Sequence, residues 1–217
     1  NILSEENRGY VCALANAIYM KADWVNKFEK EGTYKETFTD INGDESEIDF
    51  MHQAADFKYY ENGDTKAVKL PYENGLSMVV VLGDTKNILN DIHNNKMTSK
   101  LVDVSLPKFK AEYSIDYVNI LKNMGIEKAF DNQNADFSLM LENYPERIKI
   151  DSVLQKAMID VDEKGTEAAA ATVAVLTKSA LSVDEEVIEF RADKPFTYYI
   201  LDDNGNVYFA GRYVKAE

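Results

Sequence analysis

Alternation between apolar and polar residues, with a period of two, is the main pattern along this chain, and it predicts strands. Residues 10–21 are apolar and aromatic, broken by Asn16 and ending in Lys21, which indicates a buried strand. The run 76–84 is rich in β-branched residues and favours a further strand. In the C-terminal third, apolar stretches alternate with turn residues such as Asp203-Asn204-Gly205, so strands are expected there as well.

Asn-Gly pairs mark the expected turns between these strands. Polar alternation over 33–40 and 45–53 flanks Asn42-Gly43, a pattern typical of a β-hairpin with a tight turn. The pairs Asn62-Gly63 and Asn74-Gly75 repeat the same signal further along the chain. The region 33–84 is therefore predicted to be a series of hairpins.

Helical spacing of apolar residues is found in two short stretches, 87–95 and 115–125. In the second stretch Ile115, Val118 and Leu121 lie three apart, and Gly125 provides a good helix end. Strands therefore dominate and helices are few. The pattern by itself predicts a β-rich α+β domain.

Composition and charge narrow the function classes. Hydrophobic residues make up 45% of the 217 residues, which is enough for a substantial core. The formal net charge of −14 argues against nucleic acid and against an anionic membrane as partners. The chain has one cysteine, so no disulfide can form within it. A single cysteine does not decide between an extracellular and a cytoplasmic location.

The segment 162–172, DEKGTEAAAAT, is the most distinctive string in the chain. It places small residues in a row, followed by an apolar tract at 172–183 and then by acidic Asp184, Glu185 and Glu186. Alanine is the best helix former, so composition alone favours a helix here. The same small residues would also suit a strand that enters a packed sheet.

DEKGTEAAAAT resembles the reactive-loop hinge of the serpins, inhibitors that trap a protease by inserting their cleaved loop into a sheet. Other stretches resemble serpin motifs in family order, and they are ALANAIYMKADW (13–24), SLPKF (105–109), MGIEKAFDNQNADFS (124–138), FRADKPFTYYI (190–200) and FAGR (209–212). The resemblance therefore covers essentially the whole chain, and it reverses the preference for a helix.

The resemblance implies an α+β, serpin-like fold with a large central mixed sheet, smaller sheets and few helices. In the family, the motifs near Asn16 and Trp24 follow a large N-terminal helical part. We therefore expect residues 1–217 to be the C-terminal portion of a single serpin domain, with the N-terminal helical part missing. The reactive loop is expected at about residues 163–190.

Two positions depart from the family pattern. Ala22 replaces a glycine that is usual before the residue preceding Trp24, and Gln155 stands where a histidine is common. Glutamine can donate and accept hydrogen bonds, so a polar link between Gln155 and Asn16 stays open, without the pH sensitivity of histidine.

What the hinge would do follows from strand alternation. The hinge residues are Glu163, Gly165, Thr166, Glu167, Ala168, Ala169, Ala170, Ala171 and Thr172. In a central strand, Thr166, Ala168 and Ala170 would share one face and Glu167 would point to the solvent, as a charge requires. The family mechanism is then a suicide substrate, in which the protease cleaves the loop and is dragged across the sheet as the loop inserts.

The family spacing from Gly165 predicts the scissile bond between Ser179 and Ala180, with Lys178 and Ser179 as the alternative. A small residue before the bond suits an elastase-like serine protease. The alternative suits a trypsin-like enzyme with an acidic pocket. Cysteine proteases stay open as targets.

The resemblance also implies supports where the sheet would open, namely Asn16, Trp24, Lys108 and Gln155. Lys108 is expected to form a salt bridge with Glu163 that holds the sheet against premature opening, with Trp24 packed nearby. An ion pair at a partly buried site contributes more than the ~0–1 kcal/mol typical of the surface.

The resemblance implies an inhibitor and not an enzyme, because the nucleophile belongs to the target. No cofactor and no metal is expected, since His52 and His93 are isolated and lack zinc-ligand spacing. A monomer is expected, with an extracellular location favoured and a cytoplasmic one open. The alternatives are a non-inhibitory serpin that acts as a binding or chaperone-like protein and, more distantly, a hydrolase using the acidic cluster at 160–163.

Overall fold

A computed structural model describes residues 12–140, 148–166 and 187–216. The chain divides into two compact units. Unit 1 takes its residues from Asn1–Met20 and Ala111–Ile159, and unit 2 from Lys21–Lys110 and Asp160–Glu217. In the part of the chain that the structure describes, no helix is long and apolar enough to cross a membrane.

Strands dominate both units, as the sequence predicts. The strands are β1 (Ala13–Tyr19), β2 (Ala22–Asp23), β3 (Thr33–Thr39), β4 (Glu45–Asn62), β5 (Thr65–Pro71), β6 (Ser77–Leu82), β7 (Thr98–Pro107), β8 (Phe109–Asp116), β9 (Ser152–Asp162), β10 (Gly165–Thr166), β11 (Ile188–Arg191), β12 (Phe196–Leu201) and β13 (Val207–Tyr213). The described helices are short, namely α1 (Ile88–His93), α2 (Val118–Asn123) and the 3-10 turns η2 (Lys30–Gly32) and η3 (Lys128–Phe130).

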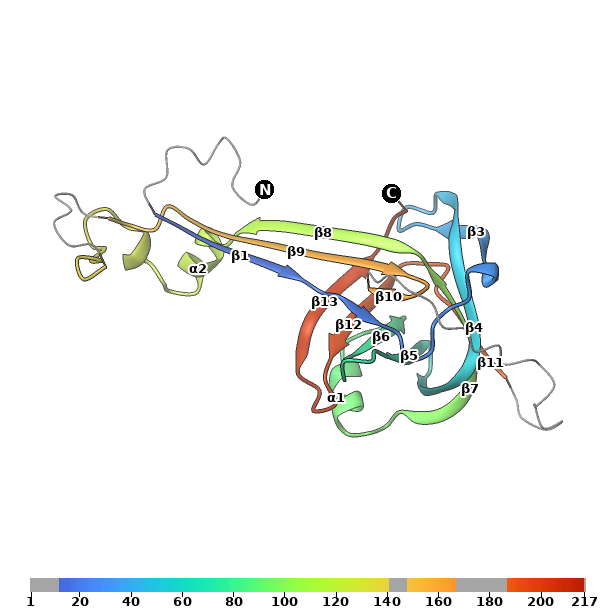
Figure 1. Ribbon diagram of the computed structural model, residues 1–217. Helices are drawn as coiled ribbons and strands as arrows, with labels where there is room; N and C mark the ends of the chain where they lie inside the picture. The colour runs from blue at the N-terminus through green and yellow to red at the C-terminus, as the bar shows by residue number, and fades with distance from the viewer. Residues whose placement is uncertain (1–11, 141–147, 167–186, 217) are drawn as a thin grey trace. The chain divides into compact units, whose positions relative to one another are not determined.

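Unit 2 contains an eight-stranded mixed sheet in the order β11-β7-β4-β5-β6-β12-β13, with β3 paired to β4 (Figure 1). The pair β11–β7 is parallel, and the other neighbours in this sheet are antiparallel. β4 is 18 residues long, so it pairs with β3 over residues 45–51, with β7 over 50–59 and with β5 over 58–62. The predicted large mixed sheet with few helices is confirmed.

The three Asn-Gly turns join β3 to β4, β4 to β5 and β5 to β6, as predicted. Gly43, Gly63 and Gly75 all have positive φ, at 88°, 58° and 83°. Glycine adopts this conformation without steric penalty, which is why these pairs are strong hairpin signals.

The core of unit 2 lies against β6. Five of its six residues are buried, and the valines at 79, 80 and 81 are fully so. A β-branched run of this kind is expected for a strand covered on both faces. Ile88 of α1 joins this core with an exposed fraction of 2%, which explains the helical spacing seen around residue 88.

In unit 1, β1 pairs in parallel with β9, from Ala13 opposite Ser152 to Tyr19 opposite Met158. The strand predicted at 10–21 is confirmed over Ala13–Tyr19, but the burial predicted for it is wrong. Five of the seven residues of β1 are exposed, including Leu14 at 49% and Tyr19 at 43%. An apolar composition of this kind is typical of a strand that packs against other residues. Among the described residues, none packs over the exposed side chains of β1.

The helix predicted at 115–125 is shorter than its pattern suggests, because Ile115 belongs to β8 and α2 starts at Val118. The Asp116 carboxylate accepts from Ser152 Oγ and, at 3.0 Å, from the Val118 backbone N–H. The Tyr117 N–H donates to the Val153 carbonyl at 2.8 Å. Because of these bonds, β8 continues to Asp116 and the helix begins only at Val118.

Candidate functional site

The turn Glu163–Gly165, between β9 and β10, is where the structure brings the predicted site residues together. The carboxylate of Asp162 accepts from the backbone N–H groups of Lys164, at 2.9 Å, and Gly165, at 3.2 Å. An aspartate that closes a turn in this way is a common local motif. Asp162 was missed as a site residue, although its spacing of three before Gly165 is a recognisable turn signal.

β10 lies between two strands in unit 2. Gly165 and Thr166 pair with Asp162 and Val161 of β9 on one side, and with Asp23 and Ala22 of β2 on the other. Gly165 and Thr166 are therefore already members of a sheet.

Gly165 is needed at this position for two reasons. Its φ is +148°, a backbone conformation that residues with a side chain rarely adopt. A Cβ placed there would lie 2.1 Å from the carbonyl oxygen of Ala22 and 2.8 Å from the backbone nitrogen of Trp24. Any side chain would therefore force β10 away from β2.

Glu163 forms the ion pair with Lys108 that the resemblance implies, with Lys108 Nζ 3.0 Å from Glu163 Oε1. The side chain of Glu163 is 8% exposed and that of Lys108 is 36% exposed. Burial by itself would raise the pKa of Glu163, but hydrogen bonds from its own backbone and from Lys108 outweigh burial, so the pKa is lowered from its ordinary value of 4.5. The buried carboxylate is thus held in its charged form.

Trp24 packs directly against this turn, as the resemblance implies. Its side chain is 1% exposed, and its Nε1 donates to the carbonyl oxygen of Asp162 at 2.9 Å. The indole stacks on Tyr72 at 4.2 Å and meets Phe28 edge-on at 6.2 Å. Tyr72 and Phe28 were not singled out from the sequence, because nothing in their local pattern links them to residue 24.

Backbone hydrogen bonds fix the segment after Trp24 to the same turn. The Trp24 N–H donates to the Lys164 carbonyl at 2.8 Å, and the Phe28 N–H donates to the Glu163 carbonyl at 2.9 Å. The turn is thereby held by one ion pair, one indole and two backbone bonds, all of which lie within unit 2.

In unit 1, Asn16 of β1 lies directly opposite Gln155 of β9. Residues opposite each other in a parallel pair point to the same face, so the two amides are adjacent. Asn16 is exposed and Gln155 is half-buried.

The hinge residues Glu167, Ala168, Ala169, Ala170, Ala171 and Thr172, and the scissile-bond candidates Lys178, Ser179 and Ala180, lie outside the described residues. For Thr166 the structure gives the backbone pairing described above.

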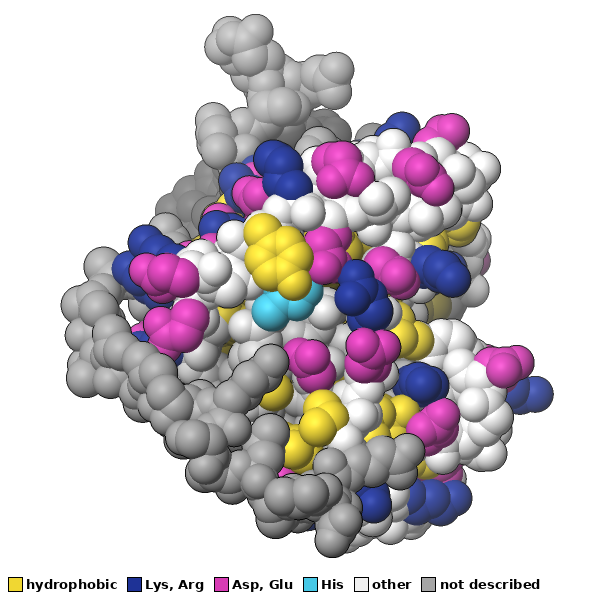
Figure 2. All heavy atoms as spheres, turned by 90° about the vertical axis from the view of Figure 1, so that its right-hand side faces the viewer, with side chains coloured by type: hydrophobic (Ala, Val, Ile, Leu, Met, Phe, Trp, Pro, Cys, Tyr) yellow, Lys and Arg dark blue, Asp and Glu magenta, His cyan; other side chains and the backbone are white. Residues whose placement is uncertain are grey.

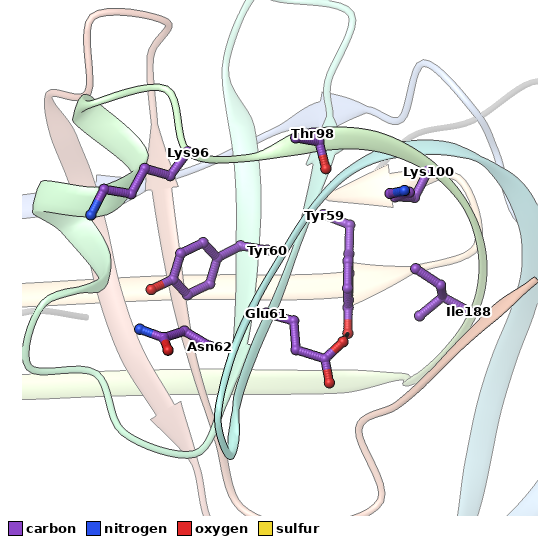
Figure 3. A pocket seen from close by; sticks show the side chains of 8 residues that line it. All are labelled: Tyr59, Tyr60, Glu61, Asn62, Lys96, Thr98, Lys100 and Ile188. Carbon is purple, nitrogen blue, oxygen red and sulfur yellow. Dashed lines mark hydrogen bonds between the residues drawn. The ribbon is translucent and has the colours of Figure 1, made fainter.

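A pocket of about 490 Å³ in unit 2 lies away from this turn, against the end of β4, the start of β7 and Ile188 of β11 (Figure 3). Its tyrosine hydroxyls already have partners. Tyr59 donates to Glu61 at 2.8 Å, and Tyr60 donates at 2.5 Å to Asp91, which also pairs with Lys96 at 2.7 Å. The two tyrosine hydroxyls, Glu61 and Lys96 therefore serve the fold.

Among residues 12–140, 148–166 and 187–216, no group of histidine, cysteine and acidic side chains is arranged to hold a metal ion. His52 and His93 lie on different elements, β4 and α1.

Comparison with known proteins gives consistent matches over the whole chain. A family model described as Serpin (serine protease inhibitor) matches residues 1–216. An uncharacterized serpin-like protein of Thermococcus kodakarensis is 37% identical over 216 residues, with 92% of this chain and 48% of that protein covered.

Two solved structures agree. Serpin48 of the insect Tenebrio molitor has a TM-score of 0.78 at 31% identity, covering 100% of this chain and 60% of that one. The thermophilic serpin Tengpin in its native state has a TM-score of 0.82 at 29% identity, with coverage of 99% and 58%. The chain spans about half the length of the curated relatives it matches.

Proposed function

Because this chain belongs to the serpin family, we propose that it forms part of a serine protease inhibitor that acts as a suicide substrate. In this mechanism the target protease cleaves the reactive loop and forms an acyl-enzyme. The cleaved loop then inserts into the sheet and carries the protease with it, which distorts the protease active site. The observation that carries the proposal is the small-residue hinge, which continues directly from the Glu163–Gly165 turn.

The strand pairing supports this mechanism. Gly165 and Thr166 already pair with β9, so an inserting loop would extend β10 along a strand that it contacts from the start. In unit 1, β1 and β9 pair directly over seven positions, and that ladder would have to part. Backbone hydrogen bonds and apolar contacts left unmade before cleavage would supply the driving force, a device already known for serpin loops.

We assign the contacts around Glu163 to control of this opening. The ion pair to Lys108 and the indole of Trp24 would hold the end of β9 and the start of β10 in place until the loop is cleaved. Asn16 and Gln155 would form a second, polar support on the ladder that has to part.

The target class follows from the residue before the scissile bond. Ser179–Ala180 favours an elastase-like serine protease, whereas Lys178–Ser179 would favour a trypsin-like one. A secreted, monomeric inhibitor fits this role. A cysteine protease target and a cytoplasmic location are the second choices.

The decisive experiment incubates the full-length protein with an elastase and, separately, with trypsin, followed by denaturing gels and mass spectrometry of the released peptide. A complex that survives denaturation, with a peptide starting at Ala180, is expected with elastase. A peptide starting at Ser179 with trypsin would establish the alternative bond. In addition, Ser179→Arg should shift inhibition towards trypsin-like enzymes, and unchanged inhibition of elastase would contradict the assignment.

Two substitutions at the hinge separate insertion from cleavage. Ala170→Arg would place a charge on the face that turns inward, so we expect normal cleavage with no stable complex. Ala169→Arg, its matched control, would place the same charge on the opposite face and should retain the complex. Cleavage without a complex in the unmodified protein would instead favour the non-inhibitory serpin.

A further inference from the structure

A row of polar side chains crosses four neighbouring strands of the eight-stranded sheet in unit 2. Arg191 of β11 lies opposite Ser105 of β7, and Ser105 lies opposite His52 of β4. Tyr34 and Glu36 of the adjacent strand β3 complete the row. Figure 2 shows this face, with a histidine beside a hydrophobic side chain and both signs of charge around it.

The imidazole of His52 is the centre of this row. Its Nδ1 lies 3.0 Å from Ser105 Oγ, and its ring stacks on Tyr34 with 4.3 Å between the centroids and 4° between the planes. Its Nε2 is buried, has no hydrogen-bond partner among the described residues, and lies 3.6 Å from Glu36 Oε1. A buried nitrogen without a hydrogen bond beside a carboxylate is a site where a proton would gain an interaction.

Glu36 connects this histidine to the edge of the sheet. Its Oε2 accepts from Arg191 Nη2 at 2.5 Å, so one carboxylate contacts His52 through one oxygen and β11 through the other. β11 is four residues long, pairs in parallel with β7 and lies at the end of the sheet. β11 is attached by this ladder and by the fully buried Phe190, and the Glu36–Arg191 pair adds a side-chain link from β11 to β3.

We propose that His52, Glu36 and Arg191 form a pH-sensitive clamp that holds β11 more tightly when His52 is protonated. The neutral ring with its proton on Nε2 can accept from the Ser105 hydroxyl and face Glu36, so protonation adds a full positive charge opposite the Glu36 carboxylate. Its charge is also attracted to the face of Tyr34. The doubly contacted Glu36 is then fixed in the position from which it binds Arg191.

The charged groups that face His52 set the sign of the effect. Glu36, on β3, favours the protonated ring. So do Asp103 of β7 and Glu189 of β11, which by strand alternation lie on the same face as Ser105 and Arg191. Arg191, on β11, opposes it. Arg191 is already neutralised by Glu36 and its side chain is 45% exposed, so solvent screens its repulsion. A protonated His52 therefore strengthens the clamp and a neutral His52 weakens it, so the clamp is favoured at the lower pH.

The test is amide hydrogen exchange of residues 188–191 in the full-length protein at about pH 5.5 and about pH 7.5, on either side of the histidine range. After correction for the intrinsic pH dependence of exchange, protection should be roughly threefold greater at the lower pH, as expected for one partly exposed ion pair. His52→Gln should abolish this difference. The matched control His93→Gln removes the other histidine of residues 1–217 and should retain it.

Glu36→Gln provides a second, independent variant, because it removes the carboxylate and leaves the histidine in place. It should also abolish the difference, even if His52→Gln does not fold. A pH difference that persists in either variant would overturn the clamp. The readout needs no protease, so failure of the clamp and failure of the proposed inhibitory function are distinguishable.

Discussion

At the scale of the single residue, Glu163 is a buried carboxylate whose charge is stabilised by its partners. A carboxylate that is 8% exposed would be unfavourable alone, but Lys108 at 3.0 Å and backbone hydrogen bonding keep it ionised. Removing one partner of such a pair leaves the other without compensation, which is more costly than losing an exposed pair. The pair is therefore a contributor to stability whose effect depends on pH.

We expect Glu163→Gln to lower the free energy of unfolding by about 1–3 kcal/mol at neutral pH, because Lys108 loses its charged partner. The lowered pKa of Glu163 gives the sign of the pH effect. Its stabilisation is complete above the ordinary value of 4.5 and is lost as the pH falls towards the folded-state pKa. Denaturant unfolding between neutral and acid pH measures both quantities.

In the same experiment, Glu163→Gln should flatten the loss of stability on acidification. The exposed Glu31 of η2 gives the matched control, Glu31→Gln, which should leave the curve of the unmodified protein in place. Equal acid sensitivity of the unmodified protein and Glu163→Gln would contradict the assigned role of the pair.

At the scale of the element, β10 depends on one residue without a side chain. β2 approaches Gly165 so closely that a Cβ would lie 2.1 Å from the Ala22 carbonyl oxygen. Gly43, in the β3–β4 turn, also has positive φ, at 88°, but nothing lies within 4 Å of its Cβ position. The two glycines thus share a backbone requirement and differ in available space.

This difference predicts unequal effects of the same substitution. Gly43→Ala should cost about 1 kcal/mol, the strain of a left-handed backbone with a side chain. Gly165→Ala should cost roughly 2–4 kcal/mol, because the clash separates β10 from β2 as well. Thermal unfolding of both variants checks the order, and equal losses would show that close approach at β10 is unimportant.

At the scale of the whole molecule, burial is distributed unevenly between the two units. β6 in unit 2 has five of six residues buried, whereas β1 in unit 1 has five of seven exposed. Local opening free energies follow burial and contact density. The two strands should therefore differ in how readily their backbone hydrogen bonds open.

We expect the amides of β1 to exchange at least about a hundredfold faster than those of β6 in the isolated chain, because exposed strands open at low free energy. Hydrogen exchange with mass spectrometry of peptides from 13–19 and 77–82 measures the ratio. The full-length protein is the comparison, and we expect slower exchange of β1 there if further residues cover it. Similar rates for the two strands in the isolated chain would contradict the uneven burial.

The local elements could be read from the sequence because their causes are local. The hairpin turns need glycine at positive φ, and a buried strand such as β6 favours β-branched residues. The sequence therefore indicates the turn at Asn42-Gly43 and the strand at 76–84. The pairing of Lys108 with Glu163, and the position of Trp24, came from the family resemblance, since no spacing rule links residues so far apart. The hinge string likewise carried the family assignment and the proposed function.

Other features were decided by tertiary structure. The strand β8 takes Ile115 away from the helix predicted there, because hydrogen bonds to Ser152 and Val153 outweigh helical spacing. The exposure of β1 depends on which other residues pack over it, and the apolar sequence of β1 alone does not determine this. The row of Glu36, His52 and Arg191 forms because β3, β4, β7 and β11 are neighbours in one sheet, and strand order is a property of the folded chain.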